Sequence, residues 1–219
     1  MSVHFQREIY ALKKHLLSLC AVVDQQVQLS VRALIDRDEE LAREVRKRDL
    51  DIDNREVEIE EECLKILALY QPVAVDLRFI VAVLKINNDL ERIGDLAVNI
   101  AKKARTLAAS DPVAIPFDLT GMSEKTQAML RDSIDALVNL DAKLADDICG
   151  RDDEIDNMKR DIRHQGEEMI VADPAQTKIL MRLMAVSRNL ERIADLATNI
   201  AEDVIYLVDG KIVRHQDGD

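Results

Sequence analysis

Apolar residues recur along this chain at steps of three and four, the spacing that places them on one face of an α-helix. The pattern begins near residue 4 and continues to residue 209 with few interruptions. Pro72, Gly150 and Asp173-Pro174 interrupt it, and such residues favour helix ends. The pattern therefore predicts an all-α protein of six long helices, over about 4–36, 40–70, 73–108, 118 or 123 to 149, 151–171 and 175–209.

The third and sixth predicted helices share a motif. Residues 89–101 and 189–201 are identical at ten of thirteen positions, and the second and fifth helices correspond at an offset of 103 residues. Repetition of this kind indicates one structural unit used twice. We therefore expect two tandem, structurally similar three-helix bundles. The predicted boundaries are 1–109 for the first bundle, 110–117 for a proline-containing linker, 118–210 for the second bundle and 211–219 for a flexible tail.

The amino-acid composition indicates a helical protein and limits the kinds of partner that it can bind. Aromatic residues make up only 3% of the chain, and strands favour aromatics. Acids outnumber bases 42 to 30, for a net charge of −12. This charge repels nucleic-acid phosphates, so we expect no nucleic-acid partner and favour cations or basic protein surfaces instead.

Nothing in the sequence predicts insertion into a membrane. No apolar run approaches the roughly 20 residues that span a bilayer, and the first residues do not resemble a signal peptide. Three isolated cysteines favour reduced thiols packed in the core. We expect a cytoplasmic protein that reaches a membrane only through its partners.

Each predicted bundle carries two pairs of acids four residues apart, a spacing that places both acids on one helix face at a cost of about 0.2–0.5 kcal/mol per pair. The pairs are Asp49/Asp53 with Glu91/Asp95, and Asp152/Asp156 with Glu191/Asp195. Carboxylates on adjacent helices can bind and bridge hard cations. The alternative is a solvated acidic face, the usual meaning of a charge row on a helix. Four pairs at matching places in two repeats favour a multinuclear metal site.

The two halves differ beside these pairs. Glu56 and Glu60 continue the acidic row of the first half, whereas Lys159 and Arg163 take the corresponding places in the second. The first half is therefore expected to present the stronger negative ridge.

The sequence favours a protein that is not an enzyme. It contains no nucleophile–base signature, no Gly-rich phosphate loop and no Glu-x-x-His motif of the ferritin-like oxidases. We therefore predict no catalytic residue. A carboxylate-bridged metalloenzyme, either a metal-dependent hydrolase or an oxidase, stays as the alternative because metal clusters can activate water.

Four segments of the chain resemble the PhoU family of phosphate-signalling proteins. They are Asp49-x-x-x-Asp53, the stretch 71–78, the Leu-Glu-Arg-Ile-Gly-Asp run at 90–95 and its relative at 190–202. The resemblance extends over nearly the whole chain, and the tandem Leu-Glu-Arg-Ile-Gly/Ala-Asp signature is its most specific part. Residues 173–178 depart from the pattern, because they lack the Asp-Leu-Arg found at 76–78.

The resemblance implies a function and a cofactor. It implies a negative regulator of phosphate uptake and of the phosphate-starvation response. Such a regulator contacts the ATPase subunit of the phosphate ABC transporter and a sensor histidine kinase, and we expect a homodimer. It also implies multinuclear metal clusters, with iron the first choice and zinc, manganese or magnesium as alternatives. Their ligands would be Asp49, Asp53, Glu91, Asp95, Asp152, Asp156, Glu191 and Asp195.

Overall fold

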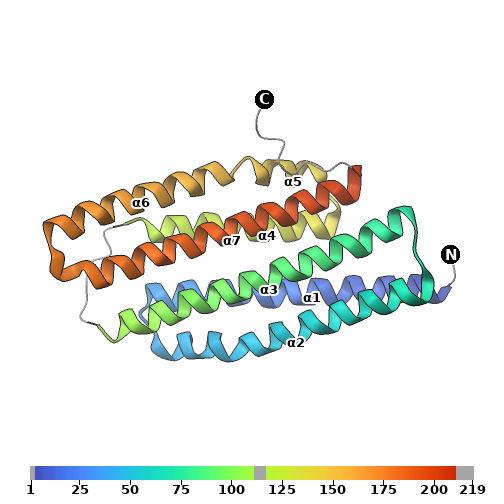
Figure 1. Ribbon diagram of the computed structural model, residues 1–219, viewed down its shortest axis with the longest axis horizontal. Coiled ribbons are helices and arrows are strands. Elements are labelled where there is room, and N and C mark those ends of the chain that lie inside the picture. Colours follow the sequence, from blue (N-terminus) through green and yellow to red (C-terminus); the bar gives the residue numbers. More distant parts are fainter. Residues whose placement is uncertain (1–2, 111–116, 211–219) are drawn as a thin grey trace.

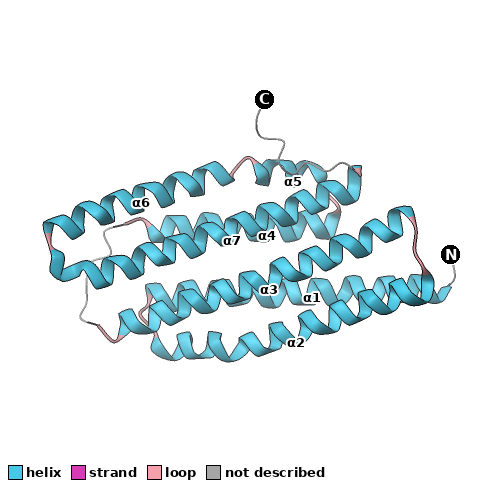
Figure 2. Ribbon diagram, in the orientation of Figure 1, coloured by secondary structure: helices cyan, strands magenta, loops and turns pink. Residues whose placement is uncertain are grey.

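The computed structural model describes residues 3–110 and 117–210, which are helical almost throughout (Figure 1, Figure 2). Within these ranges no strand occurs, and the all-α prediction is confirmed. No helix in them is long and apolar enough to cross a membrane. The elements are α1 (Val3–Ile35), α2 (Glu39–Tyr70), α3 (Ala74–Ala108), α4 (Leu119–Asn139), α5 (Ala142–Cys149), α6 (Asp152–Ala172), the 3-10 turn η1 (Pro174–Gln176) and α7 (Thr177–Asp209). Most of the predicted linker and all of the predicted tail lie outside the described residues.

The helices form two similar three-helix bundles, as predicted (Figure 1). The first contains α1, α2 and α3. In the second, α5 and α6 together take the place that α2 has in the first, beside α4 and α7. Ile86, Ile93 and Ile100 of α3 are fully buried, as are Ile193 and Ile200 of α7. Burying one such side chain stabilises the fold by about 1.5–3 kcal/mol, so these stripes hold each bundle together.

One predicted helix boundary is wrong. The periodicity predicts a fourth helix that continues to Cys149, but the chain reverses at Leu140 and Asp141. Leu140 adopts the left-handed conformation, with φ 52°, and closes α4. Gly150 keeps right-handed helical angles, φ −71° and ψ −13°. It therefore marks a short break between α5 and α6 and not a reversal.

Two equivalent aspartates start the middle helices of the bundles. The Asp141 side chain accepts hydrogen bonds from the backbone N–H groups of Lys143 and Leu144, both at 3.0 Å. In the first bundle the Asp38 side chain accepts from the Leu41 N–H at 2.9 Å. An N-cap of this kind contributes about 1 kcal/mol. Asp38 and Asp141 are 103 residues apart, the same offset that relates α2 to α6. The repeat therefore indicates that a helix begins after Asp141, which the apolar periodicity does not.

The bundles meet along α3 and α7, which lie side by side and run antiparallel (Figure 1). The Nζ atom of Lys85 is 3.2 Å from Oδ1 of Asp203, whose side chain is 2% exposed. At the end of α7, a β-carbon added to Gly210 (φ 69°) would overlap the guanidinium group of Arg78. Arg78 belongs to the 76–78 triplet that the second half lacks. It packs against the C-terminal end of α7, where backbone carbonyls favour a cation.

Candidate functional site

The predicted acids of the first half come together between α2 and α3. The negative charge of Asp49 interacts with those of Asp53 and Asp95, and that of Glu91 interacts with all three. Glu56, one turn beyond Asp53, belongs to the same group because its charge also interacts with that of Glu91. We call these five residues the first acidic cluster.

The first acidic cluster has no internal counter-charge. Among the described residues, none of its carboxylates has a Lys, Arg or His nitrogen within 4.0 Å. Partial burial, followed by repulsion from Asp53 and Asp95, raises the pKa of Asp49 to about 6; the more distant Lys102 opposes this rise only in part. Burial and the neighbouring acids, Asp95 foremost, also raise the pKa of Glu91. At neutral pH the cluster is therefore a crowded group of anions, which a cation would stabilise.

Two residues outside the acid pairs position Asp49. Gln26 of α1 is 1% exposed, and its Nε2 donates a hydrogen bond to Oδ1 of Asp49 at 3.1 Å. A β-carbon added to Gly94 of α3 would lie 3.1 Å from Cδ1 of Ile52 and 3.6 Å from Oδ1 of Asp49. Gly94 therefore lets α2 approach closely. The i, i+4 pattern misses both residues, although the change from Gly94 to Ala194 between the motifs is a signal for one of them.

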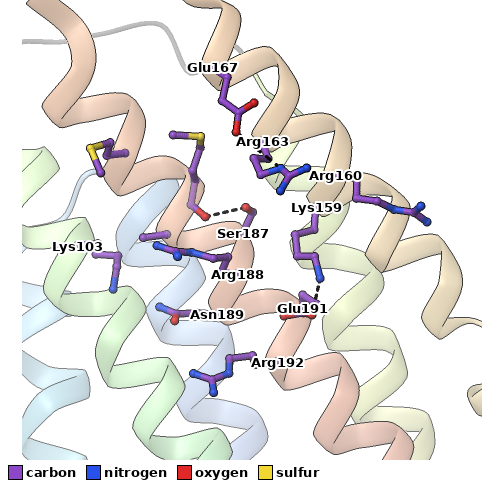
Figure 3. A pocket seen from close by; sticks show the side chains of 13 residues that line it. Lys103, Lys159, Arg160, Arg163, Glu167, Ser187, Arg188, Asn189, Glu191 and Arg192 are labelled. Carbon is purple, nitrogen blue, oxygen red and sulfur yellow. Dashed lines mark hydrogen bonds and ion pairs between the residues drawn. The ribbon is translucent and has the colours of Figure 1, made fainter. Parts of the chain in front are cut away.

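The predicted acids of the second half meet between α6 and α7, where a lysine joins them. The Nζ atom of Lys159 lies 2.6 Å from Oε1 of Glu191 and 2.8 Å from Oδ1 of Asp156; Figure 3 shows the contact to Glu191. We call Lys159 and the four predicted acids the second acidic cluster. Its members are Asp152, Asp156, Lys159, Glu191 and Asp195. Lys159 is 103 residues after Glu56, so an ammonium group sits where the first cluster has a fifth acid.

Lys159 neutralises the second cluster only in part. Although the Asp195 side chain is exposed at the surface, desolvation by its neighbours, followed by the charges of Glu191 and Asp152, raises its pKa to about 6. Burial and then Asp156 raise the pKa of Asp152. With four carboxylates and one ammonium group, the formal charge of the second cluster is −3. The five acids of the first cluster give −5.

The two clusters border a common polar cavity of about 370 Å³ between α3 and α7. Its lining consists of equivalent residues from the two motifs: Arg92, Asp95, Leu96 and Asn99 from α3, and Arg192, Asp195, Leu196 and Asn199 from α7. Asp95 and Asp195 therefore face the opposite bundle as well as the acids of their own bundle.

The donor chemistry of the first cluster fits a hard cation. All five side chains offer carboxylate oxygens, the donors that suit magnesium, manganese or ferric iron. As the side chains stand, no three potential metal-binding residues in 3–110 and 117–210 converge closely enough to hold one ion. The role of the eight predicted ligands therefore stays a prediction. In the second cluster the Lys159 ammonium group competes for the same oxygens.

Comparison with known proteins gives the family. The sequence model described as PhoU domain matches residues 16–104 and 119–204. The chain belongs to the PhoU family. A protein from Aquifex aeolicus, named phosphate-specific transport system accessory protein PhoU homolog, is 39% identical over 210 residues, which cover 96% of this chain and 95% of that protein.

Solved PhoU structures have the same fold. The crystal structure of PhoU from Pseudomonas aeruginosa matches with a TM-score of 0.92 at 36% identity, over 94% of this chain and 100% of that one. The phosphate transport system regulatory protein PhoU from Streptococcus pneumoniae matches with a TM-score of 0.84 at 30% identity, over 95% and 99%. The predicted family is confirmed. Each of the two PhoU domains contains one acidic cluster.

Proposed function

We propose that this PhoU family member is an accessory regulator of a phosphate-specific transport system. It would restrain phosphate uptake and the phosphate-starvation response through protein contacts, without catalysing a reaction. The proposal is supported by the match of two PhoU domains to this chain. It is also supported by relatives, matched over 95% and 84% of their own length, that are named accessory proteins of that system.

The proposed partners are the ATPase subunit of the phosphate ABC transporter and the cytoplasmic part of a sensor histidine kinase. The first acidic cluster is the proposed docking surface, because five carboxylates without a nearby base would attract a basic patch. A homodimer is proposed as the working assembly. That the chain acts in the cytoplasm stays a prediction from its sequence.

The acidic clusters are the proposed metal sites. Asp49, Asp53, Glu91 and Asp95 would hold a multinuclear cluster in the first half, with iron the first choice and manganese, magnesium or zinc as alternatives. Bound cations would reverse the charge of this face, so the metal-loaded cluster would contact acids on a partner and only the metal-free cluster would attract a basic patch. The corresponding acids of the second half would bind metal more weakly, since Lys159 already contacts two of their side chains.

A genetic experiment with a matched control tests the regulatory role. Deleting the gene should leave the phosphate-starvation response on in phosphate-rich medium, as read from a starvation-promoter reporter. The parent gene should restore repression, and the double variant Glu91→Gln with Asp95→Asn should restore it poorly. The control variant, Glu58→Gln with Glu61→Gln, removes the same charge from exposed positions of α2 and should restore repression fully.

Two outcomes would count against the proposal. Normal repression in the deletion strain, with no second family member present, would contradict the regulatory role. Metal-dependent hydrolysis or oxidation by the purified protein that is lost in the Glu91→Gln, Asp95→Asn variant would favour the metalloenzyme alternative.

A further inference from the structure

A second, larger cavity has the opposite electrostatic character to the first acidic cluster. It lies between α3, α6 and α7 and has a volume of about 950 Å³ (Figure 3). Six basic side chains line it: Lys103 from α3, Lys159, Arg160 and Arg163 from α6, and Arg188 and Arg192 from α7. Only two acids, Glu167 and Glu191, do so. Such an excess of base is unexpected in a chain of net charge −12.

The acids at this cavity are already engaged. Glu191 contacts Lys159 at 2.6 Å, and Glu167 lies 3.8 Å from Nε of Arg163. The other four basic groups have no carboxylate within 4.0 Å among the described residues. They are Lys103, Arg160, Arg188 and Arg192.

The hydrogen-bond acceptors of Lys103 and Arg160 are neutral oxygens. Lys103 donates to the backbone oxygen of Asn99 at 3.2 Å, and Arg160 donates to Oδ1 of Asn157 at 2.6 Å. Figure 3 shows Arg188 reaching from α7 toward Lys103 on α3. Burial, then the charges of Arg188 and Lys102, lower the pKa of Lys103. Lys103 and Arg188 thus approach one another, and among the described residues neither has a carboxylate within 4.0 Å.

The fold itself does not require this charge. The two halves correspond at an offset of 100 residues in α3 and α7 and of 103 residues in α2 and α6. Three of the four unpaired bases have counterparts without positive charge: Asp203 for Lys103, Val57 for Arg160 and Asn88 for Arg188. These three positive charges therefore do not follow from the architecture that the two halves share.

Arginine guanidinium groups and lysine ammonium groups are the side-chain groups that proteins commonly use to bind phosphate oxygens. The volume suits a whole small molecule, since ligand sites measure about 300–1,000 Å³. Met181 and Met184 add flexible apolar surface of the kind that packs against aromatic rings. We propose that this cavity binds a phosphorylated small molecule of nucleotide size, with Lys103, Arg160 and Arg188 contacting its phosphates. This proposal depends neither on the transport role nor on metal binding.

Calorimetry on the full chain tests the proposal. The titrants are ATP, pyrophosphate and orthophosphate, at 150 mM KCl with a chelator present. ATP should bind once per chain. Its affinity should exceed that of orthophosphate by about 10-fold or more. Each additional charge-assisted hydrogen bond to its phosphates should contribute about 10-fold in affinity. No binding of ATP at millimolar concentration, or equal affinities for ATP and orthophosphate, would overturn the proposal.

Matched variants separate a built site from general charge attraction. Arg188→Gln and Arg160→Gln, on different helices, should each weaken ATP binding by about 10-fold. Arg46→Gln removes the same charge from an exposed position on α2 and should leave binding unchanged. Circular dichroism checks that each variant is folded. Equal weakening by all three variants would overturn the proposal.

Discussion

The first and second acidic clusters have four carboxylate positions in common, but their charges are compensated differently. In the second cluster the Lys159 ammonium group lies within 2.8 Å of acids on both α6 and α7. In the first, the equivalent Glu56 adds a negative charge, and no base among the described residues approaches the acids within 4.0 Å. One position in a repeated fold thus decides whether the protein itself supplies a positive charge to these acids.

Exchanging the residues at this position should have the largest effect on metal binding. Glu56→Lys would place an ammonium group in the first cluster and should weaken Mn²⁺ binding there by about 100-fold, since two units of charge change within a few ångströms of the site. Lys159→Glu should strengthen binding in the second half. Calorimetry and the metal content per chain measure both effects. Unchanged affinity in both variants would show that this position does not control the sites.

Neutral substitutions at the same position should shift the stability of the metal-free protein in opposite directions. Lys159→Gln leaves Asp156 and the mostly buried Glu191 without their base, so it should lower the free energy of unfolding by about 1–2 kcal/mol. Glu56→Gln removes repulsion and should raise it by about 0.5 kcal/mol. Urea denaturation measures both changes. Two changes of the same sign would contradict the charge comparison.

Asp49 should make the stability of the metal-free protein depend on pH. Its pKa is raised from 3.8 to about 6, so its contribution favours folding below pH 4 and is lost as the pH rises through 6. Asp49→Asn avoids this loss. Because Asp49 is only partly buried, solvent screening reduces the energy, and the variant should be more stable than the parent by about 1–2 kcal/mol at pH 8 and about equally stable near pH 4. Urea denaturation across this range measures the difference, and a constant difference would refute this role of Asp49.

The smallest effect is expected for Gly94→Ala, where α2 meets α3. Gly94→Ala would place a methyl group 3.1 Å from Cδ1 of Ile52, which must move by a few tenths of an ångström. Alanine also favours a helix over glycine by about 1 kcal/mol, so the two effects should nearly cancel. Ala194→Gly, at the equivalent position, should destabilise by about 1 kcal/mol. Thermal melts of both variants test this difference, and a strongly destabilised Gly94→Ala variant would show that the contact cannot relax.

Most of the fold could be predicted because the long helices carry regular apolar stripes. The predicted ends of α1, α2, α3 and α7 agree with the structure within two residues. The turn between α4 and α5 could not be read from periodicity, since Leu140 and Asp141 include neither glycine nor proline. Its signal is the correspondence of Asp141 with Asp38, which only the repeat offset reveals.

The candidate site could be predicted only in part. The meeting of the acid pairs follows from their matching places on adjacent helices. The contact of Lys159 with Glu191 depends on the separation of α6 and α7, and the hydrogen bond from Gln26 to Asp49 depends on how α1 packs. The basic cavity combines residues from three helices, so no local spacing in the sequence indicates it.

The most direct test of the difference between the clusters is to locate bound metal in crystals of the full chain. Anomalous diffraction from crystals soaked in Mn²⁺ would show the occupancy of each cluster separately. We predict a strong peak between α2 and α3, beside Glu91 and Asp95, and a weaker one between α6 and α7. Equal occupancy of both clusters with Lys159 displaced, or the lack of a peak at the first cluster, would contradict the account.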